Sequence, residues 1–285
     1  MTLAELNTLV TDRLVPSLGR REAEATSRIL FEDILGIDRT TLLVRGAERT
    51  VEPETVDRFC RFADRIAAGY PPQYIIGKAR FMGMDFKVTP DTLIPRPETA
   101  ELVDLVTDYV ATRADARGLR ILDIGTGSGC IAIALARAIP FADIDAVDIS
   151  DRALAVAKEN NSALHTNVSF FRADILSDPI SLNDYDIVVS NPPYIAESER
   201  ADMAPRVKDY EPSTALFVPD TDPLLFYKAI VRRIVSADRV PVLFFEINPL
   251  FADRLKELCS ANSLDCDIIR DSFGKERFAK CTPRR

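Results

Sequence analysis

The chain has 285 residues, of which 47% are hydrophobic and 28% charged, so it has the composition of a globular protein with room for two domains. Its 36 basic and 44 acidic residues give a net charge of -8, which argues against a protein that binds duplex nucleic acid through a basic face. The five cysteines are scattered and form no CxxC pair, which fits neither a disulfide framework nor a zinc knuckle. The sequence has no signal-peptide pattern and no apolar run long enough for a membrane span. We therefore expect a cytoplasmic chain with reduced thiols.

The N-terminal part of the chain has helical periodicity and no alternation typical of strands. Apolar side chains recur at helical spacing in three stretches: Leu3, Leu6, Val10 and Leu14; Ala23, Leu30 and Ile34; Val56, Phe59, Phe62 and Ile66. Pro53 stands where the third helix would begin. We therefore predict a small helical domain over residues 1–77.

A different texture follows over residues 78–97. Arg80 to Val88 is short and rich in β-forming residues, with Gly83 inside it. Pro95 and Pro97 then enforce extended backbone around Arg96. We predict a β-hairpin linker here, in which Arg96 contacts the substrate or braces the linker through a salt bridge.

Strands and helices alternate over residues 98–285, which predicts an α/β domain with a doubly wound, mostly parallel sheet. The expected strands are Arg120–Ile124, Ile144–Asp148, Val168–Arg172, Asp186–Ser190, Val240–Ile247, Cys266–Arg270 and Arg277–Cys281. Amphipathic helices are expected at Ser150–Asn160 and Pro223–Ser236. The last two strands have no helix between them, so we expect them to pair as an antiparallel hairpin.

A glycine-rich turn follows the first expected strand of this domain. Gly125, Gly127 and Gly129 form G-x-G-x-G, which lets the backbone turn sharply and approach a ligand. This spacing differs from the dinucleotide pattern G-x-G-x-x-G. Asp123, just before the turn, would repel a pyrophosphate but could pair with a cationic amino-acid group.

Acidic residues end the next two strands. Asp148 stands about twenty residues after the glycines, where a carboxylate accepts hydrogen bonds from both ribose hydroxyls. Asp174 would accept from an adenine amino group and Ile175 would cover the adenine ring. Taken alone, Asp174 is more often a capping residue, but three successive strand ends together favour a site for S-adenosyl-L-methionine.

The fourth strand ends in the tetrapeptide Asn191-Pro192-Pro193-Tyr194. The two prolines hold the backbone extended and supply no N–H, so nearby carbonyls have no local donor competing for them. The Asn191 side-chain oxygen and the Pro192 carbonyl can each accept one N–H of an NH₂ group, while Tyr194 stacks on a flat conjugated group. The tetrapeptide therefore predicts methylation of an amide or amino nitrogen.

The chain has a single histidine, His165, which lies in a polar stretch read as a solvated loop. An amide nitrogen needs no strong base before it attacks a methyl group, because its proton can leave afterwards. Fixing both N–H bonds instead favours the pyramidal nitrogen of the transition state. The predicted reaction therefore agrees with the shortage of imidazole.

These motifs resemble those of the peptide chain release factor glutamine methyltransferase family over nearly the whole chain. The shared stretches are Gly69–Gly77, Leu93–Thr99, the glycine-rich turn, Asn191–Tyr194 and Tyr210–Leu216. The tetrapeptide is shared with adenine-methylating enzymes, so Ile94 to Thr99 (IPRPET) is the discriminating stretch.

The resemblance implies a Rossmann-like class I methyltransferase that uses S-adenosyl-L-methionine, yields S-adenosyl-L-homocysteine and needs no metal. It implies cofactor contacts from Gly125, Thr126, Gly127, Ser128, Gly129, Asp148, Ile175 and Asn191. It also implies that Asn191, Pro192, Pro193 and Tyr194 hold the glutamine of a Gly-Gly-Gln loop, whose N5 nitrogen is methylated. The helical domain would help to grip the release factor, with no direct contact to nucleic acid or membrane.

The chain departs from the family pattern at Arg80, Ala100, Pro219 and Asn248. We expect these positions to affect docking rather than chemistry. An enzyme that methylates a ribosomal-protein glutamine would share every chemical motif used here. A DNA adenine-N6 methyltransferase is less consistent with the acidic pI of about 4.9 and with the lack of a basic target-recognition domain. A non-catalytic module that keeps cofactor affinity is the remaining alternative, against which the intact tetrapeptide argues.

Overall fold

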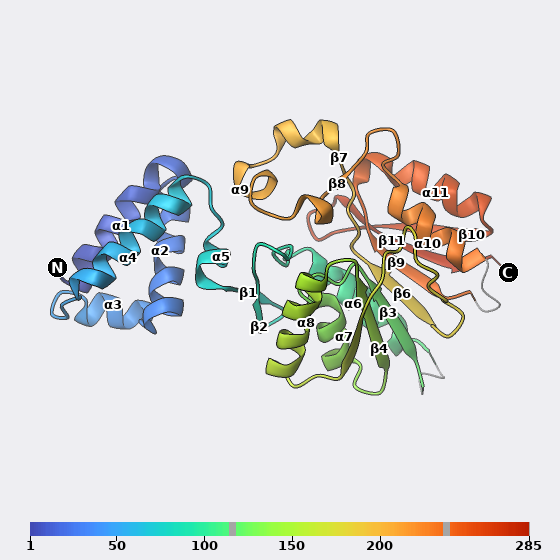
Figure 1. Ribbon diagram of the computed structural model, residues 1–285, viewed down its shortest axis with the longest axis horizontal. Coiled ribbons are helices and arrows are strands. Elements are labelled where there is room, and N and C mark those ends of the chain that lie inside the picture. The colour runs from blue at the N-terminus through green and yellow to red at the C-terminus, as the bar shows by residue number, and fades with distance from the viewer. Residues whose placement is uncertain (114–117, 236–239, 285) are drawn as a thin grey trace. The chain divides into compact units, whose positions relative to one another are not determined.

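The computed structural model describes residues 1–113, 118–235 and 240–284 (Figure 1). It divides into two compact units. The first comprises Met1–Lys78 together with Ala204–Tyr210, and the second comprises Ala79–Met203 together with Glu211–Arg285. In the described residues, no helix has the length and apolar character needed to cross a bilayer. The domain boundaries predicted after residues 77 and 97 stay predictions.

The first unit is helical. Its helices are α1 (Leu3–Leu18), α2 (Arg20–Leu35), α3 (Arg39–Arg45), α4 (Pro53–Ala67), α5 (Pro72–Ile76) and α9 (Pro205–Lys208). A capping box begins α1, because the Thr2 hydroxyl accepts from the Glu5 N–H and the Glu5 carboxylate accepts from the Thr2 N–H. The apolar faces predicted from the sequence are buried against one another around the edge-to-face ring pair of Phe31 and Phe59, which confirms these three helices.

The segment Ala204–Tyr210 belongs to this helical unit although it lies far along the chain. The ring of Tyr210 packs edge-on against Tyr70 at 5.1 Å, and its hydroxyl donates to the carbonyl oxygen of Ala68. The Arg65 guanidinium lies over the other ring of this pair, at 3.9 Å from the centroid of Tyr70. The segment is therefore packed into the helical unit rather than running free as a loop.

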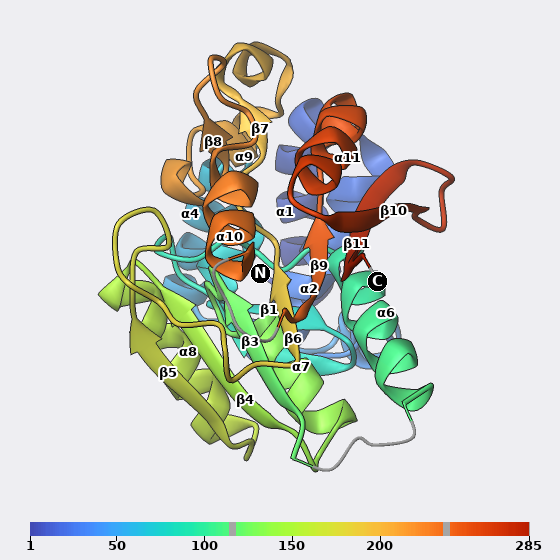
Figure 2. The same cartoon turned by 90° about the vertical axis from the view of Figure 1, so that its right-hand side faces the viewer.

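The second unit is built on a seven-stranded sheet in the order β10-β11-β9-β6-β3-β4-β5 (Figure 2). Its strands are β3 (Arg120–Ile124), β4 (Asp143–Asp148), β5 (Val168–Arg172), β6 (Ile187–Ser190), β9 (Val242–Glu246), β10 (Leu264–Arg270) and β11 (Glu276–Pro283). All neighbours are parallel except the pairs that β11 makes with β9 and β10. The predicted fold class, with its terminal antiparallel hairpin, is confirmed.

Helices cover both faces of this sheet. They are α6 (Thr99–Ala111), α7 (Cys130–Ala138), α8 (Asp151–Ala163), α10 (Leu225–Val235) and α11 (Ala252–Ala261). Side chains alternate between the two faces of the sheet along each strand, so there are two hydrophobic cores. On one face, α6 and α7 pack with Ile121 and Phe244. On the other face, α10 and α11 pack with Leu122 and Leu243. The end of the helix predicted to reach Ser236 lies outside the described residues.

Short elements complete the second unit. They are the two-stranded sheets β1 (Lys78–Phe81) with β2 (Met84–Lys87) and β7 (Ile195–Ala196) with β8 (Phe217–Val218), and the 3-10 helices η1 (Glu197–Asp202), η2 (Ser213–Ala215) and η3 (Pro249–Phe251). The side chain of Asn160 in α8 exchanges hydrogen bonds with the backbone of Lys87 and donates to the carbonyl oxygen of Ser128. One buried amide thus joins the predicted hairpin to the glycine-rich turn.

Candidate active site

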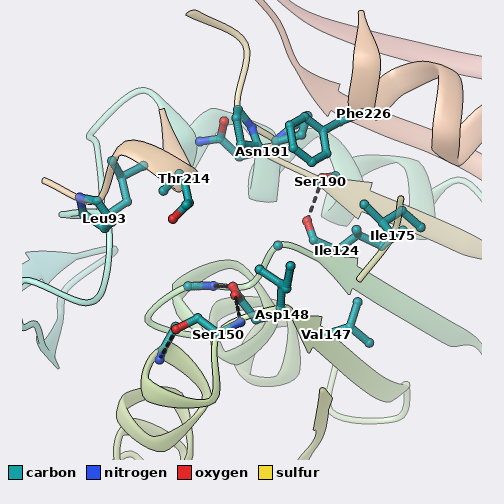
Figure 3. A pocket seen from close by; sticks show the side chains of 18 of the residues that line it. Leu93, Ile124, Val147, Asp148, Ser150, Ile175, Ser190, Asn191, Thr214 and Phe226 are labelled. Atoms are coloured by element: carbon teal, nitrogen blue, oxygen red, sulfur yellow. Dashed lines mark hydrogen bonds between the residues drawn. The ribbon is translucent and has the colours of Figure 1, made fainter. Parts of the chain in front are cut away.

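A cavity of about 460 Å³ opens at the carboxyl ends of β3, β4 and β6, where ligands bind in doubly wound sheets (Figure 3). Its walls come from the glycine-rich turn, the ends of β4 and β5, the tetrapeptide, helix α10 and the stretches 90–93 and 212–217. Among the predicted site residues, Gly125, Gly127, Asp148, Asp174, Ile175, Asn191, Pro192 and Pro193 line it. The structure therefore gathers most of the predicted site around one hollow.

The glycine-rich turn presents backbone to the cavity. The N–H groups of Gly125 and Thr126 both donate to the carbonyl oxygen of Val147, which fixes the turn against β4. Gly127 has a φ of 55°, and a Cβ built on it would meet nothing within 4 Å. The left-handed backbone and the open space toward the cavity explain why glycine stands here.

The other residues of the turn face the protein interior. Thr126, Ser128 and Gly129 are not among the described residues that line the cavity. The Thr126 hydroxyl donates to Asp123 at 2.6 Å, and Ser128 is buried. A Cβ on Gly129 would lie 3.1 Å from the Cβ of Ala157, so this glycine allows helix packing. Cofactor contacts from these three residues stay predictions.

Asp123, for which pairing with a cationic ligand was expected to be possible, is buried. Its side chain is fully buried, on the face of β3 that α7 covers, and it is not among the described residues lining the cavity. Burial raises the pKa of Asp123 to about 7. One carboxylate oxygen accepts from Thr126 and the other is buried without a hydrogen-bond partner in the described part of the chain, so the expected pairing with a cationic ligand stays a prediction.

Asp148 lies at the cavity edge and is held by backbone donors. Its two carboxylate oxygens accept from the N–H groups of Gly127 at 2.8 Å and Ser150 at 2.9 Å. Burial raises the pKa of Asp148, although these hydrogen bonds favour the charged form. The carboxylate is thus fixed in place with lone pairs left for further donors.

Asp174 and Ile175 line the neighbouring part of the cavity. The Asp174 carboxylate also accepts from the Leu176 N–H at 2.8 Å and from the Ser177 hydroxyl at 3.0 Å. Asp174 therefore caps its own turn, which is the role expected of this residue taken alone, and it also lines the cavity. Ile175 and Val147 supply an apolar surface in the same cavity (Figure 3).

The tetrapeptide is anchored at its first residue. Just before it, the Ser190 hydroxyl donates to the carbonyl oxygen of Ile124 at 2.6 Å, which ties the ends of β6 and β3 together. The Asn191 Nδ2 donates to the hydroxyl of Thr99 at 3.3 Å, and Thr99 in turn donates to Glu246 at 2.8 Å. With its NH₂ group engaged, Asn191 offers its Oδ1 as an acceptor.

Tyr194 is anchored by the same carboxylate. Its hydroxyl donates to Glu246 at 2.9 Å, and Tyr194 is not among the described residues that line the cavity, so its predicted stacking on the substrate stays a prediction. Burial raises the pKa of Glu246, while hydrogen bonds from Thr99 and Tyr194 and the charge of Arg277 oppose that shift. Burial, followed by the negative charge of Glu246, raises the pKa of Tyr194. One buried carboxylate therefore holds both ends of the tetrapeptide.

Asn248 is closer to this site than its place among the family departures suggested. Its Nδ2 donates to the carbonyl oxygen of Tyr194 at 3.2 Å and to the carboxylate of Glu199 at 2.9 Å. Its Oδ1 accepts from the N–H of Leu250. Asn248 therefore supports the backbone of the tetrapeptide, while the expectation that the departures affect docking rather than chemistry stays a prediction.

Arg96 braces the wall of the site. Its guanidinium pairs with the carboxylate of Glu211 at 2.5 Å, and the same carboxylate accepts from the N–H of Ile94 at 3.1 Å. Glu211 is only 5% exposed, whereas the side chain of Arg96 is 32% exposed, so the carboxylate is the desolvated partner of this pair. The structure therefore shows the salt bridge that was one of the two interpretations of Arg96.

The sequence did not single out several residues of the site. Glu246 ends the buried strand β9, and Thr99 was noted only as the last residue of a longer shared stretch. Phe226 stands beside Asn191 and Ser190 in the cavity wall (Figure 3). Its helix showed only amphipathic periodicity, so the sequence carried no signal that singled it out.

The sheet order and the glycine-rich turn define a Rossmann-like class I methyltransferase. Residues 100–207 match the family model of the methyltransferase small domain, and residues 11–77 match that of the PrmC N-terminal domain. The chain is 44% identical to the release factor glutamine methyltransferase of Bacteroides thetaiotaomicron, over 90% of this chain and 91% of that one. It is 39% identical to the enzyme of that name from Bacillus subtilis, over 91% and 90%. The chain belongs to the release factor glutamine methyltransferase family.

Solved structures with the same fold are more distant in sequence. The hMettl16 catalytic domain, crystallised with an RNA hairpin, has a TM-score of 0.55 and 16% identity, covering 79% of this chain and 92% of that one. Human methyltransferase 10 domain containing protein has a TM-score of 0.50 and 19% identity, covering 71% and 90%. At this identity the likeness concerns the fold alone.

Proposed function

We propose that the chain transfers a methyl group from S-adenosyl-L-methionine to the N5 nitrogen of the glutamine in the Gly-Gly-Gln motif of peptide chain release factors. The observation that carries the proposal is the anchoring of Asn191 by Thr99 and Glu246, which turns a side-chain amide into a fixed acceptor at the cavity. Two relatives with release factor glutamine methyltransferase as their name support the choice of acceptor.

The cavity suits the donor in size and in the arrangement of its walls. Its volume falls in the range of roughly 300–1,000 Å³ that is typical of small-molecule sites. Ile175 and Val147 offer an apolar face for an adenine ring. Asp148 keeps lone pairs for two ribose hydroxyls, because a carboxylate has about four acceptor positions and the backbone uses two. When bound, the donor supplies a sulfonium-activated methyl group open to displacement by a nucleophile.

The chain's own contribution is to hold the acceptor nitrogen. The Oδ1 of Asn191 and the carbonyl oxygen of Pro192 each accept one N–H of the substrate amide. Both N–H directions are then fixed, so the nitrogen lone pair turns toward the methyl donor and away from conjugation with the carbonyl. This preorganisation lowers the barrier without a strong base, since the proton can leave after the new bond has formed.

The only histidine takes no part in this scheme. His165 is exposed and follows α8, and it is not among the described residues that line the cavity. Phe226 closes one wall near Asn191, where an apolar ring keeps water from competing for the acceptor atoms. The machinery is thus one of positioning and of water exclusion.

The test is transfer of labelled methyl from S-adenosyl-L-methionine to a purified, unmethylated release factor, beside its Gly-Gly-Ala variant. We expect label only in the factor that carries glutamine. We also expect Asn191→Ala to abolish transfer even at a cofactor concentration that saturates the variant, because one substrate N–H loses its acceptor. Equal labelling of both factors, or undiminished turnover by the variant, would contradict the proposal. Labelling of ribosomal protein instead of the release factor would keep the chemistry and change the acceptor.

A further inference from the structure

Three of the five cysteines, although scattered in the sequence, converge on one face of the sheet. Cys266 in β10 and Cys281 in β11 are direct partners across the antiparallel pair. Cys259 comes from α11, which packs over this hairpin (Figure 2). The three sulfur atoms all lie within 4.8 Å of one another, and those of Cys259 and Cys281 are 3.4 Å apart. Three different elements thus bring three thiols to one point.

The spacing of the sulfurs fits a metal ion. The point equidistant from the three sulfurs lies roughly 2.0 Å from each if all spacings are 3.4 Å, and roughly 2.6 Å from each if the other two spacings reach 4.8 Å. A zinc–thiolate bond of about 2.3 Å falls inside this interval. The ligand positions are therefore already formed without rearrangement of the backbone.

The surroundings permit access to the cluster. Cys259 and Cys281 are buried, whereas Cys266 is partly exposed. An ion would enter past Cys266 and displace the thiol protons, as soft cations do on binding cysteine.

We propose that Cys259, Cys266 and Cys281 bind one thiophilic cation of the Cu(I) or Zn(II) type. In the described part of the chain, no histidine or carboxylate joins the group, so the protein supplies three sulfur ligands. Three-coordinate sulfur suits Cu(I), and Zn(II) would add water in a fourth position. None of the three cysteines is among the described residues that line the transfer cavity, so the ion has no part in methyl transfer.

The bound ion would fasten α11 to the edge of the sheet. The hairpin that carries two of the ligands also carries Phe278, whose register partner in β9 is Glu246. Fixing the hairpin therefore stabilises the strand next to the carboxylate that holds the tetrapeptide. The expected consequence is higher thermal stability with metal, and no metal requirement for turnover.

The test uses the reduced full-length protein, titrated with Zn(II) and, without oxygen, with Cu(I), each in competition with a coloured chelator. Native mass spectrometry counts the ions retained and the protons lost. We expect one ion per chain and a rise in the melting temperature with metal. Cys266→Ser should weaken binding by on the order of 100-fold or more, because it removes a direct ligand at a partly exposed position that tolerates the change.

Cys60→Ser in the helical unit is the matched control, and it should bind the ion like wild type. The proposal is overturned if wild type retains neither ion, or if Cys266→Ser and Cys60→Ser lower the affinity equally. A Cys259–Cys281 disulfide that forms while metal is present in excess would also overturn it, since thiol oxidation would then be the chemistry of this cluster.

Discussion

Replacing Glu246 by glutamine tests the anchoring of the tetrapeptide with almost no change in shape. The two carboxylate oxygens accept from different donors, Thr99 at 2.8 Å and Tyr194 at 2.9 Å. Glutamine offers one oxygen and one NH₂ group, so one of these donors must face another donor. A buried hydrogen-bonding group left unsatisfied costs about 1–3 kcal/mol. If the whole cost appears in the transition state, kcat falls roughly 5- to 160-fold.

The assay separates this effect from loss of the cofactor site. We expect Glu246→Gln to lower kcat for release-factor methylation and to leave the Kd for S-adenosyl-L-methionine, measured by calorimetry, close to that of wild type. The reason is that Glu246 supports Asn191 and Tyr194 but is not among the described residues that line the cavity.

The control is Glu276→Gln, the same substitution on the neighbouring strand, where the side chain pairs with Arg270 near the surface. It should leave kcat unchanged. A correctly folded Glu246→Gln protein with the kcat of wild type would refute the reasoning. So would a fall in kcat fully matched by the control.

Other substitutions test the remaining parts of the site. Thr99→Val removes the hydroxyl between Asn191 and the buried carboxylate, so kcat should fall about tenfold and Thr99→Ser should restore it. Both Gly129→Ala and Gly127→Ala strain the backbone, but a methyl group at Gly129 also overpacks its neighbours, which costs about 1–3 kcal/mol more. Gly129→Ala should therefore lower the melting temperature more than Gly127→Ala. Gly127→Ala should weaken cofactor binding more than Gly129→Ala. Folded Asp123, with a pKa raised to about 7, binds protons that the unfolded chain releases near pH 4, so wild type loses stability as pH rises through this window. The free energy of unfolding of Asp123→Asn minus that of wild type, measured with denaturant, should therefore increase by roughly 1.4 kcal/mol per pH unit between about pH 5 and 7. Parallel pH profiles of the two proteins would contradict this.

The sequence predicted those parts of the site that depend on local order along the chain. The glycine-rich turn, Asp148 and Asn191 each follow a strand, and in a parallel sheet such positions meet at one edge. Knowledge of the strand order was enough to bring them together. The pairing expected of Asp123 stays a prediction, because its side chain is buried and its place next to the turn in the sequence does not report the burial.

Long-range contacts could not be predicted in the same way. Glu246 reaches Thr99 across 147 positions of sequence, and neither residue has a local pattern that announces a buried hydrogen bond. The convergence of Cys259 with Cys266 and Cys281 depends on the register of one antiparallel pair and on where α11 crosses it. Such meetings are set by packing, which spacing in a single sequence does not report.

The segment Ala204–Tyr210 affects how the helical unit can be exchanged between related proteins. The chain passes between the units three times, after Lys78, after Met203 and after Tyr210, so this unit is not a cassette that one cut could remove. A recombination event that exchanged only the N-terminal region would leave Tyr210 facing a foreign partner in place of Tyr70. Substitutions at these two distant positions should therefore be accepted together, and a shortened protein that begins after Lys78 should expose the side chain of Tyr210, which stands 16 positions after Tyr194 at the end of the tetrapeptide.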